Sequence, residues 1–363
     1  MRKGIALFLI CFLLGMRTAA MDVVQTQAEL FGVENLREGL NSRAETLMDE
    51  YSPVVQADFG ESLIEIFRDA IRQSDGYIKS TIAVMARIFA IIILCKIVVS
   101  IGNKHASAAS LLAGSLAITA CCISDVRTMI GLGGDVIEEI NGFTSLLLPV
   151  MAAATTASGA PASGGVIYTV SALFCDILIR LCKLFIVPML YAFLALGLAD
   201  AALGQNRLGK VCELIGWSIK SLLKTILYVF TGLLATSGVI SGATDAAALK
   251  TAKLAISGMI PVVGGIVSDA SASLLAGAGV LKSAIGTFGM LAVLAVFMLP
   301  FFRMGISYLG FKLTAALCGI LDTGHSKLLD TITGLMGYML AMVGSCTVMS
   351  LIACCCFVKT VTP

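Results

Sequence analysis

Three charged residues stand at helical spacing in an otherwise apolar stretch. Asp176, Arg180 and Lys183 are separated by four, three and seven positions, which places them on one face of a helix. Charges inside a membrane are costly and often line a path for ions, protons or a substrate. The same spacing also allows Asp176 and Arg180 to neutralise each other at a helix end, while Lys183 extends to the membrane surface. The pattern therefore indicates either a passage lining or a neutralised helix end.

A second candidate is the segment SGMIPVVGGIVSDASASLLAGAGV, residues 257–280. Pro261, Gly264 and Gly265 interrupt an apolar run there, and Asp269 follows. A broken helix can line a cavity, because its freed backbone groups need water or protein partners. Small residues also let neighbouring helices approach closely, so a kinked and tightly packed helix explains the segment equally well.

The segment around Pro149 resembles the segment around Pro261 when the sequence is aligned with itself at an offset of 112 residues. The shift superposes Pro149 on Pro261 and Pro188 on Pro300, although few other positions match. Paired broken segments in two halves are typical of transporters. We therefore treat Pro149, Asp176, Arg180, Pro261, Gly264, Gly265 and Asp269 as candidate conduit or hinge positions.

Motifs for catalysis and cofactor binding are missing from the chain. It has no GxxxxGK[ST] for nucleotide phosphates, no HExxH and no GxSxG. Its 12 cysteines include no CxxC pair, most lie in apolar runs, and there are only two histidines. We therefore expect no enzymatic activity, no cofactor and no metal centre.

The N-terminus has the features of an export signal. Arg2 and Lys3 precede a 12-residue apolar core, and Thr18-Ala19-Ala20 supplies small residues for cleavage. We expect a signal peptide over residues 1–20. The core is shorter than the roughly 20 residues that span a bilayer, which argues against an uncleaved anchor.

Residues 21–80 predict an exported, acidic and helical head. An apolar stripe at Val33, Leu36, Leu40, Leu47 and Tyr51 indicates one helix, and a second follows at Phe59, Leu63, Phe67 and Ile71. Ser52-Pro53 separates them, so the pattern predicts a helical hairpin. The stripes either pack on each other or offer a docking surface for another exported protein, and these interpretations are compatible.

The remainder, residues 81–363, reads as a multi-span membrane domain. The chain is 58% hydrophobic and 13% charged, with a mean hydropathy of +0.96, whereas soluble domains carry about 25% charged residues. Net charge is −7 over residues 21–80 and +6 over residues 81–363, which favours a sided membrane protein and argues against nucleic-acid binding. We therefore expect lipid to surround this domain.

Apolar runs predict an all-α bundle of seven to nine spans. Residues 125–143 are acidic and suit an outer loop, whereas Arg207, Lys210, Lys220 and Lys224 suit the cytoplasmic face. Residues 143–203 fit three spans, or two spans and a re-entrant hairpin. The other predicted spans cover residues 81–102, 106–124, 221–242, 283–302, 304–321 and 331–358, with a Gly-rich stretch at 243–282.

The stretch TDAAALKTAKLAISGMIPVVGGIVSDASASLLAGAGVLKSAIG, from Thr244 onward, resembles the signature region of the stage III sporulation protein AE family of endospore-forming bacteria. The signal peptide, the helical head, the segment FTSLLLPVMAAATTASGAPASGG and the polytopic remainder agree with that family. The most specific block surrounds Asp245, Thr251-Ala252-Lys253, Pro261 and Ser268-Asp269-Ala270. The resemblance covers nearly the whole mature chain.

This resemblance implies a multi-pass subunit of the mother-cell membrane around the engulfed forespore. Its implied partners are the other stage III sporulation A-operon proteins, an ATPase and ring-forming subunits, together with a forespore-side channel protein. The assembly would act as a secretion or feeding channel that sustains late forespore gene expression, with the head in the intermembrane space. The alternative function is a stand-alone solute permease with an internal repeat.

Two mechanisms are open for the broken segments near Pro149 and Pro261. Facing each other at mid-membrane, they would form either the lining of a passage or a rigid seat on which partner rings assemble. The family supplies no catalytic residues to assign to this chain.

Overall fold

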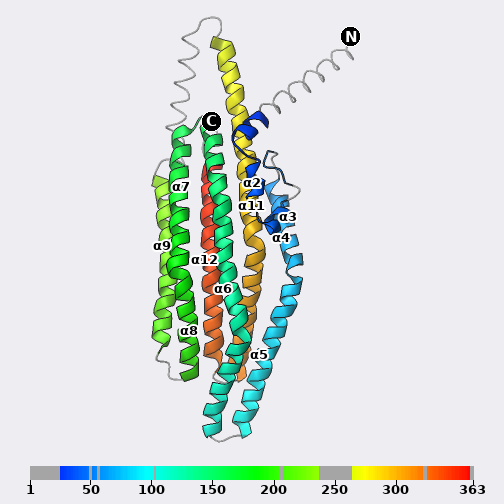
Figure 1. Ribbon diagram of the computed structural model, residues 1–363, viewed down its shortest axis with the longest axis vertical. Coiled ribbons are helices and arrows are strands. Elements are labelled where there is room, and N and C mark those ends of the chain that lie inside the picture. The colour runs from blue at the N-terminus through cyan, green and yellow to red at the C-terminus, as the bar shows by residue number, and fades with distance from the viewer. Residues whose placement is uncertain are drawn as a thin grey trace, which may run out of the picture.

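The computed structural model is a long bundle of helices. It describes residues 25–48, 51–54, 58–101, 104–203, 208–236, 264–321 and 325–359. All regular secondary structure in these ranges is helical (Figure 1). The predicted all-α membrane fold is confirmed in this part of the chain. The predicted signal peptide lies outside the described residues.

Three very long helices form the centre of the bundle. They are α6 (Lys104–Ala157), α11 (Gly264–Leu321) and α12 (Ser326–Lys359), and they pack against one another more extensively than any other set. With 54 and 58 residues, α6 and α11 are about 81 and 87 Å long at 1.5 Å per residue. α12 has buried side chains on several faces along most of its length, and residues 278–300 of α11 are enclosed as well.

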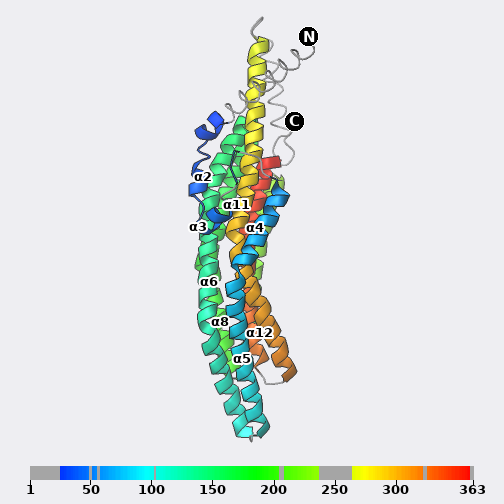
Figure 2. The same cartoon turned by 90° about the vertical axis from the view of Figure 1, so that its right-hand side faces the viewer.

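The remaining long helices surround this centre. α5 (Asp75–Ile101) packs on α6 and α11. α7 (Pro161–Leu181) continues through a π-helical turn, η1 (Cys182–Ile186), into α8 (Val187–Leu203), and α9 (Gly209–Thr236) lies beside α7, α8 and α12. The α5–α6 hairpin extends past the ends of the other helices (Figures 1 and 2).

Six segments of the described chain are long and apolar enough to cross a membrane. They cover Asp75–Ile101, Ala109–Ala157, Pro161–Ala201, Gly209–Ala235, Ala278–Leu321 and Ser326–Lys359. The predicted number of seven to nine is not confirmed. Part of the predicted Gly-rich stretch, residues 237–263, lies outside the described residues.

Residues 125–143, predicted to form an outer loop, are instead the middle of α6. The prediction was wrong because the acidic residues of this segment lie on exposed or half-buried positions of a helix, while Val126, Val136 and Ile140 are buried in the core. A helix that is polar on one side and apolar on the other needs no loop to accommodate its charges.

Two further breaks expected from the sequence are not present. Residues 283–302 and 304–321 were predicted as separate spans, but Arg303 lies within the single helix α11. Residues 164–203 also follow one helical path, because the π-turn η1 joins α7 to α8. A π-turn accommodates an extra residue without ending a helix.

The first half of the head is not the single helix that the apolar stripe predicted. Within the stripe, from Val33 to Tyr51, the chain forms two short helices, α2 (Asn35–Glu38) and α3 (Ser42–Leu47), which are separated near Gly39. Gly39 faces the end of the Leu146 side chain of α6, so the chain passes close to that helix at this point. The stripe residues Val33 and Leu36 are buried, as expected.

The second half of the head is α4 (Phe59–Gln73), which Asp58 caps by accepting hydrogen bonds from Gly60 and Glu61. Its buried face is displaced from the predicted stripe: Ile66 and Ala70 are buried, whereas Phe67 and Ile71 remain largely exposed. Both halves pack on the long helices, α2 on α6 and α3 and α4 on α11. The two stripes therefore do not form a self-contained hairpin.

Candidate functional site: a charged belt at mid-bundle

Two ion pairs lie side by side on the surface of the bundle, halfway along α6. Arg180 Nε contacts Asp176 Oδ2 at 2.8 Å within α7, and Lys183 Nζ of η1 contacts Glu138 Oε1 of α6 at 2.5 Å. The spacing of the three charges on α7 and η1 therefore places them on a common face, as the sequence predicted. Lys183, however, is paired with a residue of another helix.

All four side chains of these pairs point outward from the bundle. Arg180 and Asp176 are 75% and 59% exposed, and Lys183 and Glu138 are 52% and 56% exposed. Pairs with this exposure contribute little to stability, because solvent or headgroups screen them. Their outward direction means that Asp176 and Arg180 do not line the interior of one copy of the bundle.

A second polar cluster joins three helices. The hydroxyl of Tyr77 in α5 lies 2.6 Å from Ser307 Oγ in α11, and it also contacts Met129 Sδ in α6 at 3.6 Å. The guanidinium of Arg303 lies 5.9 Å from the centre of the Tyr77 ring. A cation over an aromatic face is attracted by the ring quadrupole. Sequence spacing gave no signal for this cluster, since its members are far apart in the chain.

A third part of the belt is on α9. Lys220 Nζ lies 5.2 Å from the ring centre of Tyr338 in α12, and that ring packs edge-on against Phe193 of α8. Lys224 follows one turn further along α9 and is exposed. Lys220 and Lys224, two of the four basic residues predicted for the cytoplasmic face, therefore lie in the middle of a helix.

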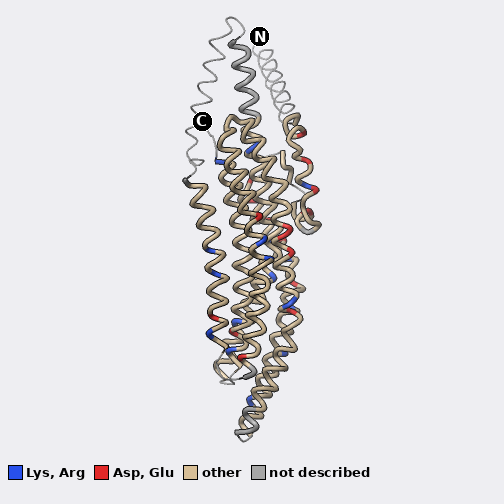
Figure 3. Tube along the Cα trace, turned by 60° about the vertical axis from the view of Figure 1, so that its left-hand side comes forward, with Lys and Arg blue, Asp and Glu red and all other residues tan. Residues whose placement is uncertain are grey.

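These groups are spread along the middle part of the bundle. Gly133 of α6 faces Met342 of α12 and Met304 of α11, so Arg303 lies near its level. Tyr338 precedes Met342 by four residues and Glu138 follows Gly133 by five, so the Lys220 contact and the Glu138–Lys183 pair are roughly 13 Å apart along the bundle. We call the following residues the charged belt: Glu138, Asp176, Arg180, Lys183, Lys220, Lys224 and Arg303. Figure 3 shows where charged residues lie along the helices.

The other predicted positions are not assembled into this belt. Pro149 lies inside the uninterrupted helix α6, so the expected break at that position is absent. Gly264 and Gly265 begin α11, and Asp269 is in its second turn. Pro261 lies outside the described residues. The expected meeting of two broken segments at mid-membrane is therefore not seen for Pro149.

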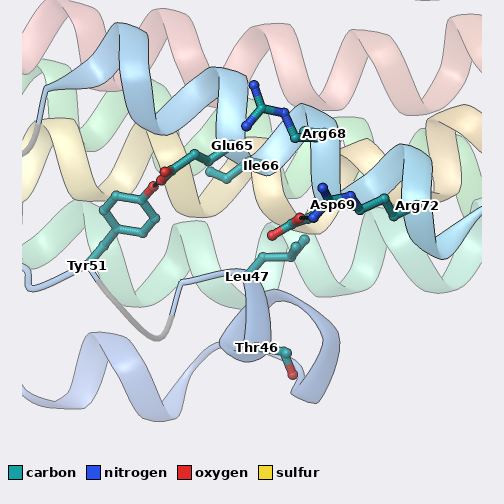
Figure 4. A pocket seen from close by; sticks show the side chains of 8 residues that line it. All are labelled: Thr46, Leu47, Tyr51, Glu65, Ile66, Arg68, Asp69 and Arg72. Carbon is teal, nitrogen blue, oxygen red and sulfur yellow. Dashed lines mark hydrogen bonds and ion pairs between the residues drawn. The ribbon is translucent and has the colours of Figure 1, made fainter.

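The head carries a separate cavity of about 380 Å³. Its lining residues come from α3, from α4 and from the connection between them: Thr46, Leu47, Tyr51, Glu65, Ile66, Arg68, Asp69 and Arg72 (Figure 4). The Tyr51 hydroxyl donates to Glu65 Oε2 at 2.6 Å, and Arg72 contacts Asp69 at 3.6 Å. This cavity is polar and open to one side of the head.

The chemistry available to these sites is electrostatic. The belt offers exposed ion pairs and lysines, and the head offers a small cavity bordered by charges of both signs. Within the described ranges no three His, Cys, Asp or Glu side chains lie close enough together to hold a metal ion. The arrangement suits contacts with charged lipid or protein surfaces.

Comparison with known proteins gives a family assignment. Residues 45–360 match the family model described as stage III sporulation protein AE. The chain is 21% identical over 202 residues to the stage III sporulation protein AE of Bacillus subtilis (strain 168). That alignment covers 56% of this chain and 51% of the relative, so the chain spans about half the length of the relative it matches. No solved structure matches.

Proposed function

Because this chain belongs to the stage III sporulation protein AE family, we propose that it is an integral membrane subunit of the channel that links mother cell and forespore during sporulation. The match over residues 45–360, which includes nearly all of the helical bundle, is the observation that supports this function. The six apolar segments agree with a multi-pass subunit. Its proposed role is structural or conduit-forming and not enzymatic.

The bundle could either line a passage or serve as a rigid seat on which partner proteins assemble. We favour the seat over a passage inside one copy of the chain. The contacts among α6, α11 and α12 are filled with buried apolar side chains, which belong to one continuous core. Asp176 and Arg180 point outward from this core. A passage to which this chain contributes would then lie between neighbouring subunits of the assembly, with charged side chains of the belt facing it.

The distribution of basic residues supports an orientation for the bundle. The ends of α5, α8 and α11 lie at one end, while the head packs toward the other (Figure 1). Among the described residues near the first end, the basic residues outnumber the acidic ones: Lys96, Lys104, Lys210, Lys312 and Lys327 against Asp200, Glu213 and Asp330. Because positive residues favour the cytoplasmic side, we propose that this end faces the mother-cell cytoplasm. The head then faces the intermembrane space.

Deletion of the gene in its spore-forming host tests the proposed function. Forespore size and late forespore transcription are compared with those of the wild type after engulfment. Collapsed and transcriptionally silent forespores, restored by the full chain, are the expected result. Normal spores would contradict the channel role and favour a stand-alone permease, which would transport solutes in cells lacking the partner proteins.

Variants of the complementing gene separate the seat from the passage. Replacing Gly264 or Gly265 with leucine is expected to release the ring-forming partners from the membrane if the start of α11 is part of the seat. Asp176→Ala and Asp269→Ala are expected to impair sporulation without loss of membrane insertion if these residues line a passage. Wild-type sporulation in both aspartate variants would eliminate the lining role.

A further inference from the structure

Two of the long helical paths contain a proline that weakens them near the middle of the bundle. Proline has no backbone N–H and its ring crowds the carbonyl four residues earlier. Pro300 lies inside α11, and Pro188 is the second residue of α8, directly after the π-turn η1. The π-turn also departs from regular α-helical bonding, because the N–H of Val187 donates to the carbonyl of Cys182. Both α11 and the α7–α8 path therefore have a local weak point.

Contacts between α6 and α11 fix the level of the first weak point. Gly289 of α11 packs on Leu147 of α6, and Met304 packs on Gly133, so the two helices run in opposite directions. Pro300 precedes Met304 by four residues. It therefore lies level with the turn of α6 that follows Gly133.

The second weak point lies at the same level. Lys183 of η1 pairs with Glu138 of α6, and α7 and α8 run opposite to α6, because α6 and α7 are joined by a short turn at residues 158–160. Pro188 follows Lys183 by five residues, and Gly133 precedes Glu138 by five. Pro188 is therefore level with Gly133, within about 10 Å of Pro300 along the bundle.

Three further helical paths are interrupted or carry glycine at this level. α4 ends and α5 begins at Ser74, one turn before Tyr77. The hydroxyl of Tyr77 contacts Met129 of α6, which is one turn from Gly133. α6 has Gly133 itself, and α12 has Gly344 directly after a residue that Gly133 faces. Glycine stabilises a helix less than any other residue except proline, so these positions also favour a bend.

We propose that this level is a hinge, at which the half of the bundle next to the head bends relative to the other half. Its members, which we call the hinge layer, are Ser74, Gly133, Pro188, Pro300 and Gly344. α4 and α7 lie on the head side of the layer, and α5 and α8 lie on the other side (Figure 1). Prolines and π-turns are the usual places where long helices bend. This inference does not depend on the proposed sporulation role.

One ion pair bridges two helices beside the hinge layer. Glu138 of α6 and Lys183 of η1 hold the π-turn against the neighbouring helix. A bend at η1 changes the separation of these two side chains, so the pair restrains the bend. Because both side chains are more than half exposed, the restraint is weak and depends on salt.

The bend is measured by double electron–electron resonance on the full-length chain in nanodiscs. Nitroxide labels are attached through genetically encoded ketone amino acids at Tyr168 of α7 and Leu313 of α11, which are exposed and lie on opposite sides of the hinge layer. Labels on cysteine are avoided because the chain has 12 cysteines. The wild type is expected to give a broad or two-peaked distance distribution. P188A/P300A, which restores two backbone donors, should narrow it to a single peak.

Pro149 provides the matched control. It also lies inside a helix, but it is 16 residues, or about 24 Å, from Gly133 along α6. P149A should therefore leave the distance distribution unchanged. Equal distributions in the wild type and in P188A/P300A, or the same narrowing in P149A, overturn the proposal.

The restraining pair is tested with the same labels. E138Q and K183Q are each expected to raise the population of the bent form roughly twofold at low salt, and the wild type at high salt should approach them. D69N, which removes an exposed ion pair within α4, should have no effect. An unchanged distribution in both E138Q and K183Q overturns the restraint.

Hydrogen exchange locates the hinge independently of the labels. Residues 182–192 and 296–306 are expected to exchange faster than the flanking turns of the same helices. In P188A/P300A this exchange should slow at least tenfold, because a proline inside a helix is strongly destabilising. Equal exchange of these segments and their flanking turns in the wild type would also overturn the proposal.

Discussion

α12 and the charged belt meet at Tyr338, but their surroundings differ. Along α12 the side chains of Met336, Met339 and Met342 are buried among neighbouring helices, and their fit depends on shape. In the belt, Asp176, Arg180 and the Glu138–Lys183 pair are exposed and depend on charge. The difference indicates that α12 holds the helices together, while the belt defines what the outside of the bundle contacts.

This division has a physical basis in membranes. Lipid chains are as apolar as a protein core, so helices in a bilayer associate mainly through close packing. Exposed ion pairs add little to that association. Substitutions that change shape at α12 should therefore affect stability more than substitutions that remove charge at the belt.

The largest expected effect comes from a steric change against α12. A Cβ atom at Gly197 in α8 would overlap the side chain of Thr331 in α12. Gly197→Leu is expected to destabilise the bundle by about 3 kcal/mol, since overpacked cores must shift side chains and backbone. Thermal unfolding in detergent measures the loss. Thr331→Ala should restore part of it, and Gly305→Ala, with open space around the new methyl group, should not destabilise.

A smaller effect is expected at Tyr77, which lies beside Arg303 of the belt and contacts a buried side chain. Tyr77→Phe removes the hydroxyl that contacts Ser307 and Met129, and the cost should lie between about 1 and 2 kcal/mol because Ser307 is buried. The same unfolding assay applies. An unchanged melting temperature would show that this cluster behaves like the exposed part of the belt.

The head provides an intermediate test between core and surface. Asp58→Ala removes the side-chain cap of α4 and is expected to cost about 1 kcal/mol of local helix stability. Hydrogen exchange over residues 59–73 should become faster, while α12 remains protected. Asp58→Asn retains an acceptor and serves as the control. Faster exchange along α12 would mean that the head also stabilises the centre.

The smallest effect is expected at the ion pair itself. A double-mutant cycle with Glu138→Gln and Lys183→Gln should give a coupling of about 0.5 kcal/mol that decreases as salt is added. A salt-independent coupling of several kcal/mol would contradict the distinction between a packed centre and an exposed belt. It would mean that this pair is shielded from water, as buried pairs are.

Some features of the fold and the site follow from local sequence. The apolar composition predicted the helical membrane class, and the spacing of Asp176 and Arg180 allowed the pairing that is observed, as one of two alternatives. The buried positions Val33, Leu36 and Leu40 also followed from helical periodicity. These features depend on residues within one or two turns of each other, where spacing alone fixes the geometry.

Other features depended on contacts between distant segments. In one of the two interpretations Lys183 extended to the membrane surface, but it contacts Glu138 on the neighbouring helix, in a segment that the sequence assigned to a loop. The face of α4 that is buried could not be derived from its own stripe, because α11 determines it. Tyr77 and Ser307 are 230 residues apart, so no local pattern relates them.

The sequence by itself determined that this chain is an apolar, helical membrane protein with a charged set on α7 and a family-specific segment after Thr244. Only the tertiary structure decided how many separate helices those apolar runs form and which way their charges point. The reason is that hydrophobicity records the preference of each residue for an apolar environment, which protein and lipid provide equally. The identity of that environment is fixed only when the helices pack.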